Sequence, residues 1–359
     1  MDGTKIKAHA QSKFTGTIEN FNKRKETLES KINLAVKKLE ESQQSEESKK
    51  YWENKIERHE KDLEKINTFL NSAEKILTIR GDEVQQNVND SDCRIMKDKG
   101  SYVEAYNVQA TVCENTGIIV SCDTTNHSND SANFVTNFEK TKENLEKIGS
   151  PIKLEESENL ADAGYYSTGN IEYIANNEIN AFIPKKQDKN VYMDKKDKAK
   201  VILEKQKLTS EDIDIIQTED GVEAYCPNNL KLCQDDKLVK DRESYYYCFH
   251  KEDKSECVNC QFYDLCYGKN KYKTFKIREG IINNYKNIKQ MQEKLECDEG
   301  RMIYSKRMPM IEKVFGQIKH NLNFRRFTRV GMDKVSVQWN MVCTAFNIKK
   351  LFVLKYGNQ

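Results

Sequence analysis

The spacing of hydrophobic positions first separates a helical region from a strand-rich one. From about residue 17 to residue 79, apolar side chains recur at steps of three, four and seven, first as far as Leu39 and again from Ile56 onward. The polar stretch SQQSEESK, residues 42–49, interrupts this pattern. We therefore expect an antiparallel helical hairpin whose many Glu and Lys side chains form a solvated surface.

The pattern then becomes strand-like. Residues 101–114 (SYVEAYNVQATVCE) and 117–125 (GIIVSCDTT) are rich in Val, Ile, Tyr and Thr, and they flank an Asn-Thr-Gly turn signal. This predicts a β-hairpin. A helix is expected to follow and to end near Gly149-Ser150-Pro151.

Shorter elements complete the expected fold. The opening DGTKIKAHAQ and residues 180–184 are expected to form short strands, and residues 159–167 a short strand that ends at Asp162 and is followed by a turn. Residues 308–322 and 332–354 are expected to form helices. This order predicts an α/β protein with a mixed sheet flanked by helices. The expected core stripe of the last helix is Val335, Trp339, Val342, Phe346, Ile348 and Leu351.

Composition narrows the class of protein. The 359 residues include 59 Lys and Arg against 57 Asp and Glu, so the net charge of +2 gives no global argument for nucleic acid. The mean hydropathy is −0.84, and no apolar run is long enough for a membrane span. The N-terminus lacks the apolar stretch of a signal peptide. We therefore expect a cytoplasmic protein that has no membrane partner.

Several of the 11 cysteines are clustered. Cys257, Cys260 and Cys266 have C-x2-C-x5-C spacing, and Cys248 lies upstream. Thiolates at such short spacing can complete a tetrahedral structural Zn²⁺ site. Reduced thiols without a metal and redox chemistry remain the alternatives. Cys226 and Cys233 are further candidates for ligands.

Three acidic residues occupy positions that suit metal-dependent phosphoryl transfer. Asp2 lies in the first expected strand, Asp162 ends the strand NLAD, and Glu312 lies in the first turns of the helix that contains Pro309. Two divalent cations that act on DNA need a few carboxylates converging from rigid elements. Because the chain has 57 acidic residues, such a triad alone is weak support for a site.

The residues around the three acids make the pattern more specific. Four segments follow one another along nearly the whole chain. In order they are DGTKIKAHA, DCRIMKDKGSYVEAYNVQATV, LADAGYYS and MIEKVFGQIKHNLNFRRFTRVGMDKV. Together they resemble the DDE-type transposases of bacterial insertion sequences, in the branch with a cysteine-bearing insertion before the glutamate helix. By this resemblance, the chain lacks the family's N-terminal DNA-binding region.

The resemblance implies an RNase H-like fold and metal-dependent hydrolysis and strand transfer in DNA transposition. Asp2, Asp162 and Glu312 would be the catalytic ligands of Mg²⁺ or Mn²⁺. Double-stranded DNA, as element ends and target, would be the partner, and a homodimer on DNA stays open. Related families have a tyrosine and an arginine before the glutamate and a lysine after it. Tyr304, Arg307 and Lys319 take these places here, although the spacing from arginine to glutamate is one residue longer than in the family pattern.

The helix that contains Glu312 and the segments on either side of it carry a local excess of positive charge. Between residues 301 and 329, Glu312 is the only acidic residue among many Lys and Arg, which is typical of a surface that contacts phosphates. Phe324 and Phe327 are expected to pack in the core. The residues expected to contact DNA are Tyr304, Arg307, Lys319, Arg325, Arg326 and Arg329.

The expected organisation has five parts. Residues 1–16 would be the first strand of the catalytic core, 17–80 a helical-hairpin insertion, 81–184 further core, 185–276 a Cys-rich insertion, and 277–359 the C-terminal helices. Two other functions stay open. One is a catalytically inactive, truncated transposase that still binds DNA; the other is a zinc-stabilised interaction module.

Overall fold

The computed structural model describes residues 1–41, 45–78, 80–185, 202–218, 221–253, 255–268 and 273–357. The chain forms two compact units. The end unit comprises Asp2–Asp130 and Met310–Gln359, and the middle unit comprises Met1 and Ser131–Pro309. None of the described helices is long and apolar enough to cross a membrane.

An antiparallel sheet forms the centre of the end unit. Strand β5 (Ser101–Val112) pairs with β1 (Asp2–Lys7) and β4 (Arg94–Asp98), and β6 (Ile119–Thr125) also pairs with β5. The predicted β-hairpin is confirmed as β5 and β6. Gly117 in its turn has φ +67°, a conformation that glycine adopts without strain.

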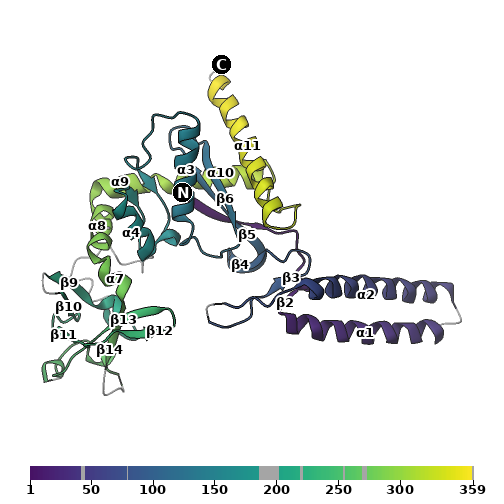
Figure 1. Ribbon diagram of the computed structural model, residues 1–359, viewed down its shortest axis with the longest axis horizontal. Helices are drawn as coiled ribbons and strands as arrows, with labels where there is room; N and C mark the ends of the chain where they lie inside the picture. Colours follow the sequence, from purple (N-terminus) through teal and green to yellow (C-terminus); the bar gives the residue numbers. More distant parts are fainter. Residues whose placement is uncertain are drawn as a thin grey trace. The chain divides into compact units, whose positions relative to one another are not determined.

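Two C-terminal helical segments contribute to the core of the end unit. They are α10 (Arg307–Gly316), which continues into a π-helical segment at Gln317–Asn321, and α11 (Met332–Tyr356) (Figure 1). Trp339 of α11 is fully buried, and its indole N–H donates to the carbonyl of Gln109 on β5 at 3.2 Å. The core cluster includes Ile6, Val108, Ala110, Ile311, Val314, Phe315, Ile318, Phe327, Val335, Trp339 and Phe346.

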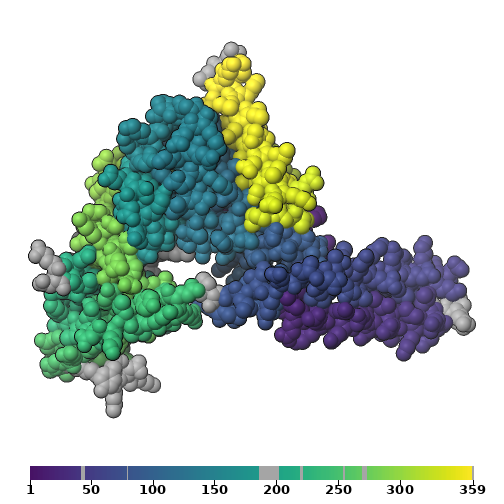
Figure 2. Space-filling view, in the orientation of Figure 1, coloured from purple at the N-terminus to yellow at the C-terminus, as the bar shows by residue number. Residues whose placement is uncertain are grey.

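The predicted stripe on α11 is correct only in its first half. Trp339 and Phe346 are buried as expected, but Ile348 and Leu351 are 64% and 52% exposed. The reason is that the core cluster of this unit reaches along α11 only as far as Phe346. The later turns stand at the surface (Figure 2, yellow).

The predicted helical hairpin is present as α1 (Ile18–Glu41) and α2 (Glu46–Ser72), which lie side by side (Figure 1). Phe21 and Phe69 pack edge to face near its base, with ring centroids 5.1 Å apart. Residues 42–44 of the expected break, and residue 79 at its expected end, lie outside the described residues. The short strands β2 (Thr15–Gly16) and β3 (Gln86–Asn87) pair beside the hairpin.

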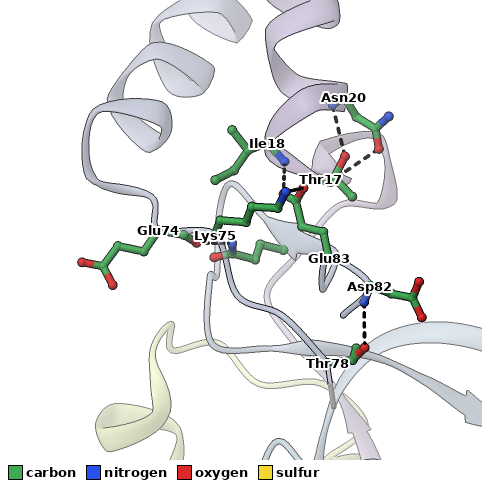
Figure 3. A network of polar contacts seen from close by, with 9 residues as sticks. Thr17, Ile18, Asn20, Glu74, Lys75, Thr78, Asp82 and Glu83 are labelled. Atoms are coloured by element: carbon green, nitrogen blue, oxygen red, sulfur yellow. Dashed lines mark hydrogen bonds and ion pairs between the residues drawn. The ribbon is translucent and has the colours of Figure 1, made fainter. Parts of the chain in front are cut away.

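A polar network anchors the first turn of α1 (Figure 3). The carboxylate of Glu83 accepts a hydrogen bond from the backbone N–H of Ile18 at 2.7 Å and faces the Lys75 ammonium at 3.8 Å. The backbone N–H of Asn20 donates to the Thr17 hydroxyl at 3.2 Å. A carboxylate at a helix N-terminus satisfies an otherwise unpaired N–H and interacts favourably with the helix dipole.

The middle unit begins with a small α/β arrangement. β7 (Asn159–Leu160) pairs in parallel with β8 (Ala181–Phe182). The strand expected to end at Asp162 is present but ends two residues earlier, at Leu160. The turn expected after Asp162 is the 3₁₀ turn Ala163–Tyr165, which the Asp162 side chain caps. The helices of this unit include α3 (Phe134–Lys147), α4 (Thr168–Asn176), α7 (Glu279–Asn283), α8 (Tyr285–Glu296) and α9 (Asp298–Ser305).

A six-stranded antiparallel sheet occupies most of the segment expected to be a polar insertion, and it was not predicted. Residues 186–201 of that expected insertion lie outside the described residues. The strands run in the order β12-β13-β11-β10-β9, with β14 on β13. Their bounds are β9 Asp214–Thr218, β10 Gly221–Tyr225, β11 Lys231–Gln234, β12 Val239–Asp241, β13 Ser244–His250 and β14 Thr274–Arg278.

Candidate nucleic-acid and metal site

Asp2 is the first residue of β1 and pairs with Ala110 of β5. Cross-strand partners point to the same face of a sheet, and Ala110 belongs to the core cluster that includes Ile311 and Val314 of α10. Asp2 is half-buried, and its Oδ1 accepts the N–H of Gly3 at 2.8 Å. This hydrogen bond holds the carboxylate at the start of the strand.

Asp162 of the middle unit follows β7 and is held in the same way. Its Oδ1 accepts the N–H of Gly164 at 2.8 Å and thereby caps the 3₁₀ turn. The side chain is half-buried. Within this unit, the amino group of Met1 donates to the carbonyl of Leu160, two residues before Asp162, at 2.6 Å.

Glu312 lies in α10, and its side chain is exposed. The residues around it in the helix, Ile311, Val314 and Phe315, are buried in the core cluster of the end unit. This pattern fixes α10 by its apolar face and leaves Glu312 at the surface.

Lys319 lies in the π-helical segment and reaches β1. Its ammonium donates to the hydroxyl of Thr4 at 2.6 Å and to the carbonyl of Lys5 at 3.2 Å. Burial lowers the pKa of this ammonium below its usual value. Between Glu312 and Lys319 the α-helix changes into the π-helical segment, whose turns are wider than α turns. The amine is thus already used inside the protein.

The arginine-rich segment after this helix runs beside the first strand. Arg326 forms a parallel bridge with Lys7, whose N–H donates to the carbonyl of Arg325 at 3.3 Å. The Arg325 guanidinium turns back to the carbonyl of Lys319 at 3.0 Å. Arg326 and Arg329 are exposed, and neither forms an ion pair with another described residue. Their charges can therefore interact with an external anion.

Phe327 is buried in the core, as predicted, whereas Phe324 is half-buried and packs against the core cluster. The Phe327 ring meets the Tyr106 ring edge to face with centroids 5.7 Å apart, and Phe324 stacks on Trp339 at 6.2 Å. These contacts fix the backbone on both sides of Arg325 and Arg326.

Tyr304 and Arg307 lie together in the middle unit. The Arg307 guanidinium is 5.9 Å from the Tyr304 ring centroid, within cation–π range. Tyr304 is half-buried and packs against the cluster that contains Leu160 and Phe182 of β7 and β8. The phenol ring thus forms part of the packing beside the strand that leads to Asp162.

Sequence reasoning missed two hydrogen-bond networks of the end unit that are centred on aspartates. Asp130 accepts hydrogen bonds at 2.7 Å from the side-chain amides of Asn107 and Gln109. A Cβ on Gly3 would lie 2.5 Å from the Asp130 carboxylate, so a larger residue beside Asp2 would have to displace that side chain. Asp90 accepts the Tyr106 hydroxyl at 2.7 Å. No local sequence pattern signals these long-range pairs.

The structure brings three of the four cysteines proposed as zinc ligands together with a different fourth one. Cys257, Cys260, Cys266 and Cys226 line one small pocket in the middle unit. Cys248 is buried on β13 and does not line that pocket. Within each unit, no three described His, Cys, Asp or Glu side chains already have the arrangement of a metal site.

Comparisons with known proteins point to one class. A family model described as a transposase DDE domain matches residues 225–352, about a third of the chain. The match supports a DDE transposase, a nucleic-acid-processing enzyme, and the mixed α/β fold is consistent with a DDE nuclease. It includes Glu312 but neither Asp2 nor Asp162. Searches of curated proteins and of solved structures found no match.

Proposed function

We propose that the chain is the catalytic domain of a DNA transposase with an RNase H-like core, belonging to the insertion-sequence branch with a cysteine-bearing insertion. One observation carries this proposal most directly. The Lys319 ammonium donates to the Thr4 hydroxyl, two residues after Asp2, at 2.6 Å. The helix that carries Glu312 is therefore hydrogen-bonded to the strand that begins at Asp2. This joins two segments from opposite ends of the sequence, both of which the resemblance assigns to the active site.

The donor set fits a hard divalent cation. Asp2, Asp162 and Glu312 offer carboxylate oxygens, which are the protein ligands that Mg²⁺ and Mn²⁺ prefer. Asp2 and Asp162 are each oriented by a backbone N–H at 2.8 Å. When bound, the cations would lower the pKa of water and stabilise negative charge on the phosphate oxygens. The three carboxylates would hold them.

Lys319 then serves as a positioning residue. Its ammonium keeps the helix that carries Glu312 in register with β1, because it donates to both the Thr4 hydroxyl and the Lys5 carbonyl. Lys319 lies in the π-helical segment, which places its side chain within hydrogen-bond distance of β1. Such segments occur frequently at functional sites.

Arg326 and Arg329 would contact the DNA backbone. Both are exposed on the segment that runs beside Lys7, and the aromatic packing of Phe324 and Phe327 holds that segment in place. Cations on a rigid support bind phosphates with a smaller entropy cost. Tyr304 and Arg307 would contribute from the middle unit, where they contact each other.

The proposal is tested by Mn²⁺-dependent cleavage of a DNA that carries an element end. Asp162→Ala and Glu312→Ala should each abolish cleavage while the far-ultraviolet circular dichroism spectrum stays unchanged. Cleavage that persists in either folded variant would refute the assignment. DNA binding without any cleavage by the wild type would indicate an inactive DNA-binding remnant, and no salt-dependent DNA affinity would indicate an interaction module.

A further inference from the structure

Four cysteines line one small pocket within the six-stranded sheet region of the middle unit. The pocket has a volume of about 30 Å³, and Cys226, Cys257, Cys260 and Cys266 are among its lining residues. A void of about 10–15 Å³ already holds one water-sized species. The pocket is therefore large enough for a single ion and too small for an organic ligand.

Tight backbone turns present these thiols. Cys226 follows β10, and its carbonyl accepts the N–H of Asn229 at 2.8 Å in a turn where Asn229 has φ +60°. The Cys257 carbonyl accepts the N–H of Cys260 at 3.0 Å. Two cysteines separated by two residues on such a turn are typical of structural zinc sites.

The alternation of side chains along the strands excludes Cys248. On β13, Phe249 pairs with Phe275 of β14, and both are buried in the core of this sheet. Phe275 lines the pocket. Because successive residues of a strand point to opposite faces, Cys248 points away from the face that carries Phe249.

The same reasoning excludes Cys233. Its neighbour on β11, Leu232, is buried in the sheet core and lines the pocket. Cys233 therefore points to the opposite face, where it pairs with His250 of β13.

The charges around the pocket suit a tetrathiolate centre. Four thiolates carry more negative charge than Zn²⁺ neutralises, and Lys273 lines the same pocket. Lys251 lines it too and forms an ion pair with Glu256 at 2.7 Å. Burial, and after it the neighbouring thiols of the pocket, raise the pKa of Cys266 to about 11, while Lys273 lowers it. A bound cation would favour the thiolate form of the cysteines that line the pocket.

We propose that Cys226, Cys257, Cys260 and Cys266 bind one structural Zn²⁺ as thiolates, with Cys248 outside the site. Binding requires the side chains to rotate toward the pocket centre, since no three of them already have metal-binding spacing. Each thiol loses its proton to solvent as its sulfur bonds to the metal, and no electrons are transferred. The ion would cross-link the turn after β10 to the segment that contains the 3₁₀ helix Ser255–Cys257 and the helix Tyr263–Cys266. This inference is independent of the proposed transposase activity.

The first test measures metal content and ligand type in the full chain purified under reducing conditions. We expect one zinc per chain by mass spectrometry and, after exchange with Co²⁺, the intense charge-transfer bands of a tetrathiolate complex. X-ray absorption should give a single sulfur shell at about 2.3 Å. Absence of metal binding, or a Co²⁺ spectrum with oxygen or nitrogen ligands, would overturn the proposal.

Two variants separate the proposed ligand set from the set predicted from sequence. Cys226→Ser should lose the tetrathiolate Co²⁺ spectrum and bind zinc at least tenfold more weakly. Cys248→Ser, the matched control, should retain the tetrathiolate Co²⁺ spectrum and the zinc affinity of the wild type. The reverse pattern would assign the fourth ligand to Cys248 and overturn the proposal.

A measurement on the wild type avoids any loss of folding in the variants. Thiols are alkylated with and without a zinc chelator, and each cysteine is quantified by peptide mass spectrometry. We expect chelation to increase labelling at Cys226, Cys257, Cys260 and Cys266 and to leave Cys248 unchanged. Chelator-independent labelling at all four positions would contradict the site.

Discussion

The ammonium of Lys319 donates to the hydroxyl of Thr4 at 2.6 Å, across a sequence separation of 315 residues. The contact ties the helix that carries Glu312 to the strand that begins at Asp2. Hydrogen bonds to charged groups contribute about 1.5–3 kcal/mol when they are shielded from water. This one pair therefore connects the geometry of the proposed site to the stability of the end unit.

A double-mutant cycle measures that contact. Thr4→Val and Lys319→Met should each lower the free energy of unfolding, and the double variant should lose about 1 kcal/mol less than the sum of the two, because either change alone removes the same bond. Urea unfolding monitored by tryptophan fluorescence gives the values. Strict additivity would show that the two side chains do not interact.

The lowered pKa of Lys319 predicts a pH dependence of stability. Burial disfavours the charged amine in the folded state, so the folded pKa lies below the unfolded one. The unfolded chain then binds more protons between the two pKa values, and this residue's contribution to stability rises with pH there.

Unfolding free energies of the wild type and of Lys319→Met, measured at about pH 7 and about pH 10, test this sign. At the higher pH, the free energy of unfolding of the wild type should increase relative to that of the variant. A relative loss would mean that the ammonium is favoured, not disfavoured, by its surroundings.

The two halves of α11 should respond differently to truncation. Trp339→Ala removes a fully buried side chain that also bonds Gln109, and it should cost about 3–5 kcal/mol. Ile348→Ala, at a position 64% exposed, should cost less than about 0.5 kcal/mol in the isolated chain. Thermal unfolding compares the two. A large effect of Ile348→Ala would mean that its side chain is covered by a contact that the structure does not contain.

Local patterns in the sequence were sufficient to predict some helices and strands but not others. The alternation in residues 101–125 predicts β5 and β6, because their pairing is local and one face is buried. The stripe on α11 was predicted too long, since periodicity does not show where the partner surface ends. The six-stranded sheet was missed because every strand except β13 has five residues or fewer, and all three residues of β12 are exposed.

The same limit applies to the candidate sites. Asp162 and Glu312 were proposed from their local motifs, and their role as metal ligands stays a prediction. The hydrogen bond from Lys319 to Thr4 joins residues that no local pattern relates. The cysteine spacing identified Cys257, Cys260 and Cys266, but the choice between Cys226 and Cys248 needs the face of β13 to be known.

The exposed arginines beside β1 should carry part of the DNA affinity. Replacing Arg326 and Arg329 together by Gln should weaken binding similarly for unrelated DNA sequences. The slope of the logarithm of the binding constant against that of salt concentration should fall by about 1 for each phosphate that the protein no longer neutralises. Fluorescence anisotropy across a salt series measures both quantities.

A matched variant controls for net charge. Lys31→Gln with Lys37→Gln removes the same charge from exposed positions of α1. It should leave the salt slope nearly unchanged. Equal effects of the two double variants would show that binding reflects overall charge and not the arginine segment.

The most direct measurement of the central claim is cleavage of an end-bearing DNA duplex with Mg²⁺ or Mn²⁺ by the wild type, Glu312→Gln and Glu60→Gln. Glu312→Gln keeps the size of the side chain and removes its charge, whereas Glu60 is an exposed glutamate of α2 that serves as the control. We predict metal-dependent cleavage by the wild type and Glu60→Gln and a loss of at least a hundredfold in Glu312→Gln. Equal cleavage by all three proteins would contradict the assignment of Glu312 to a catalytic metal site.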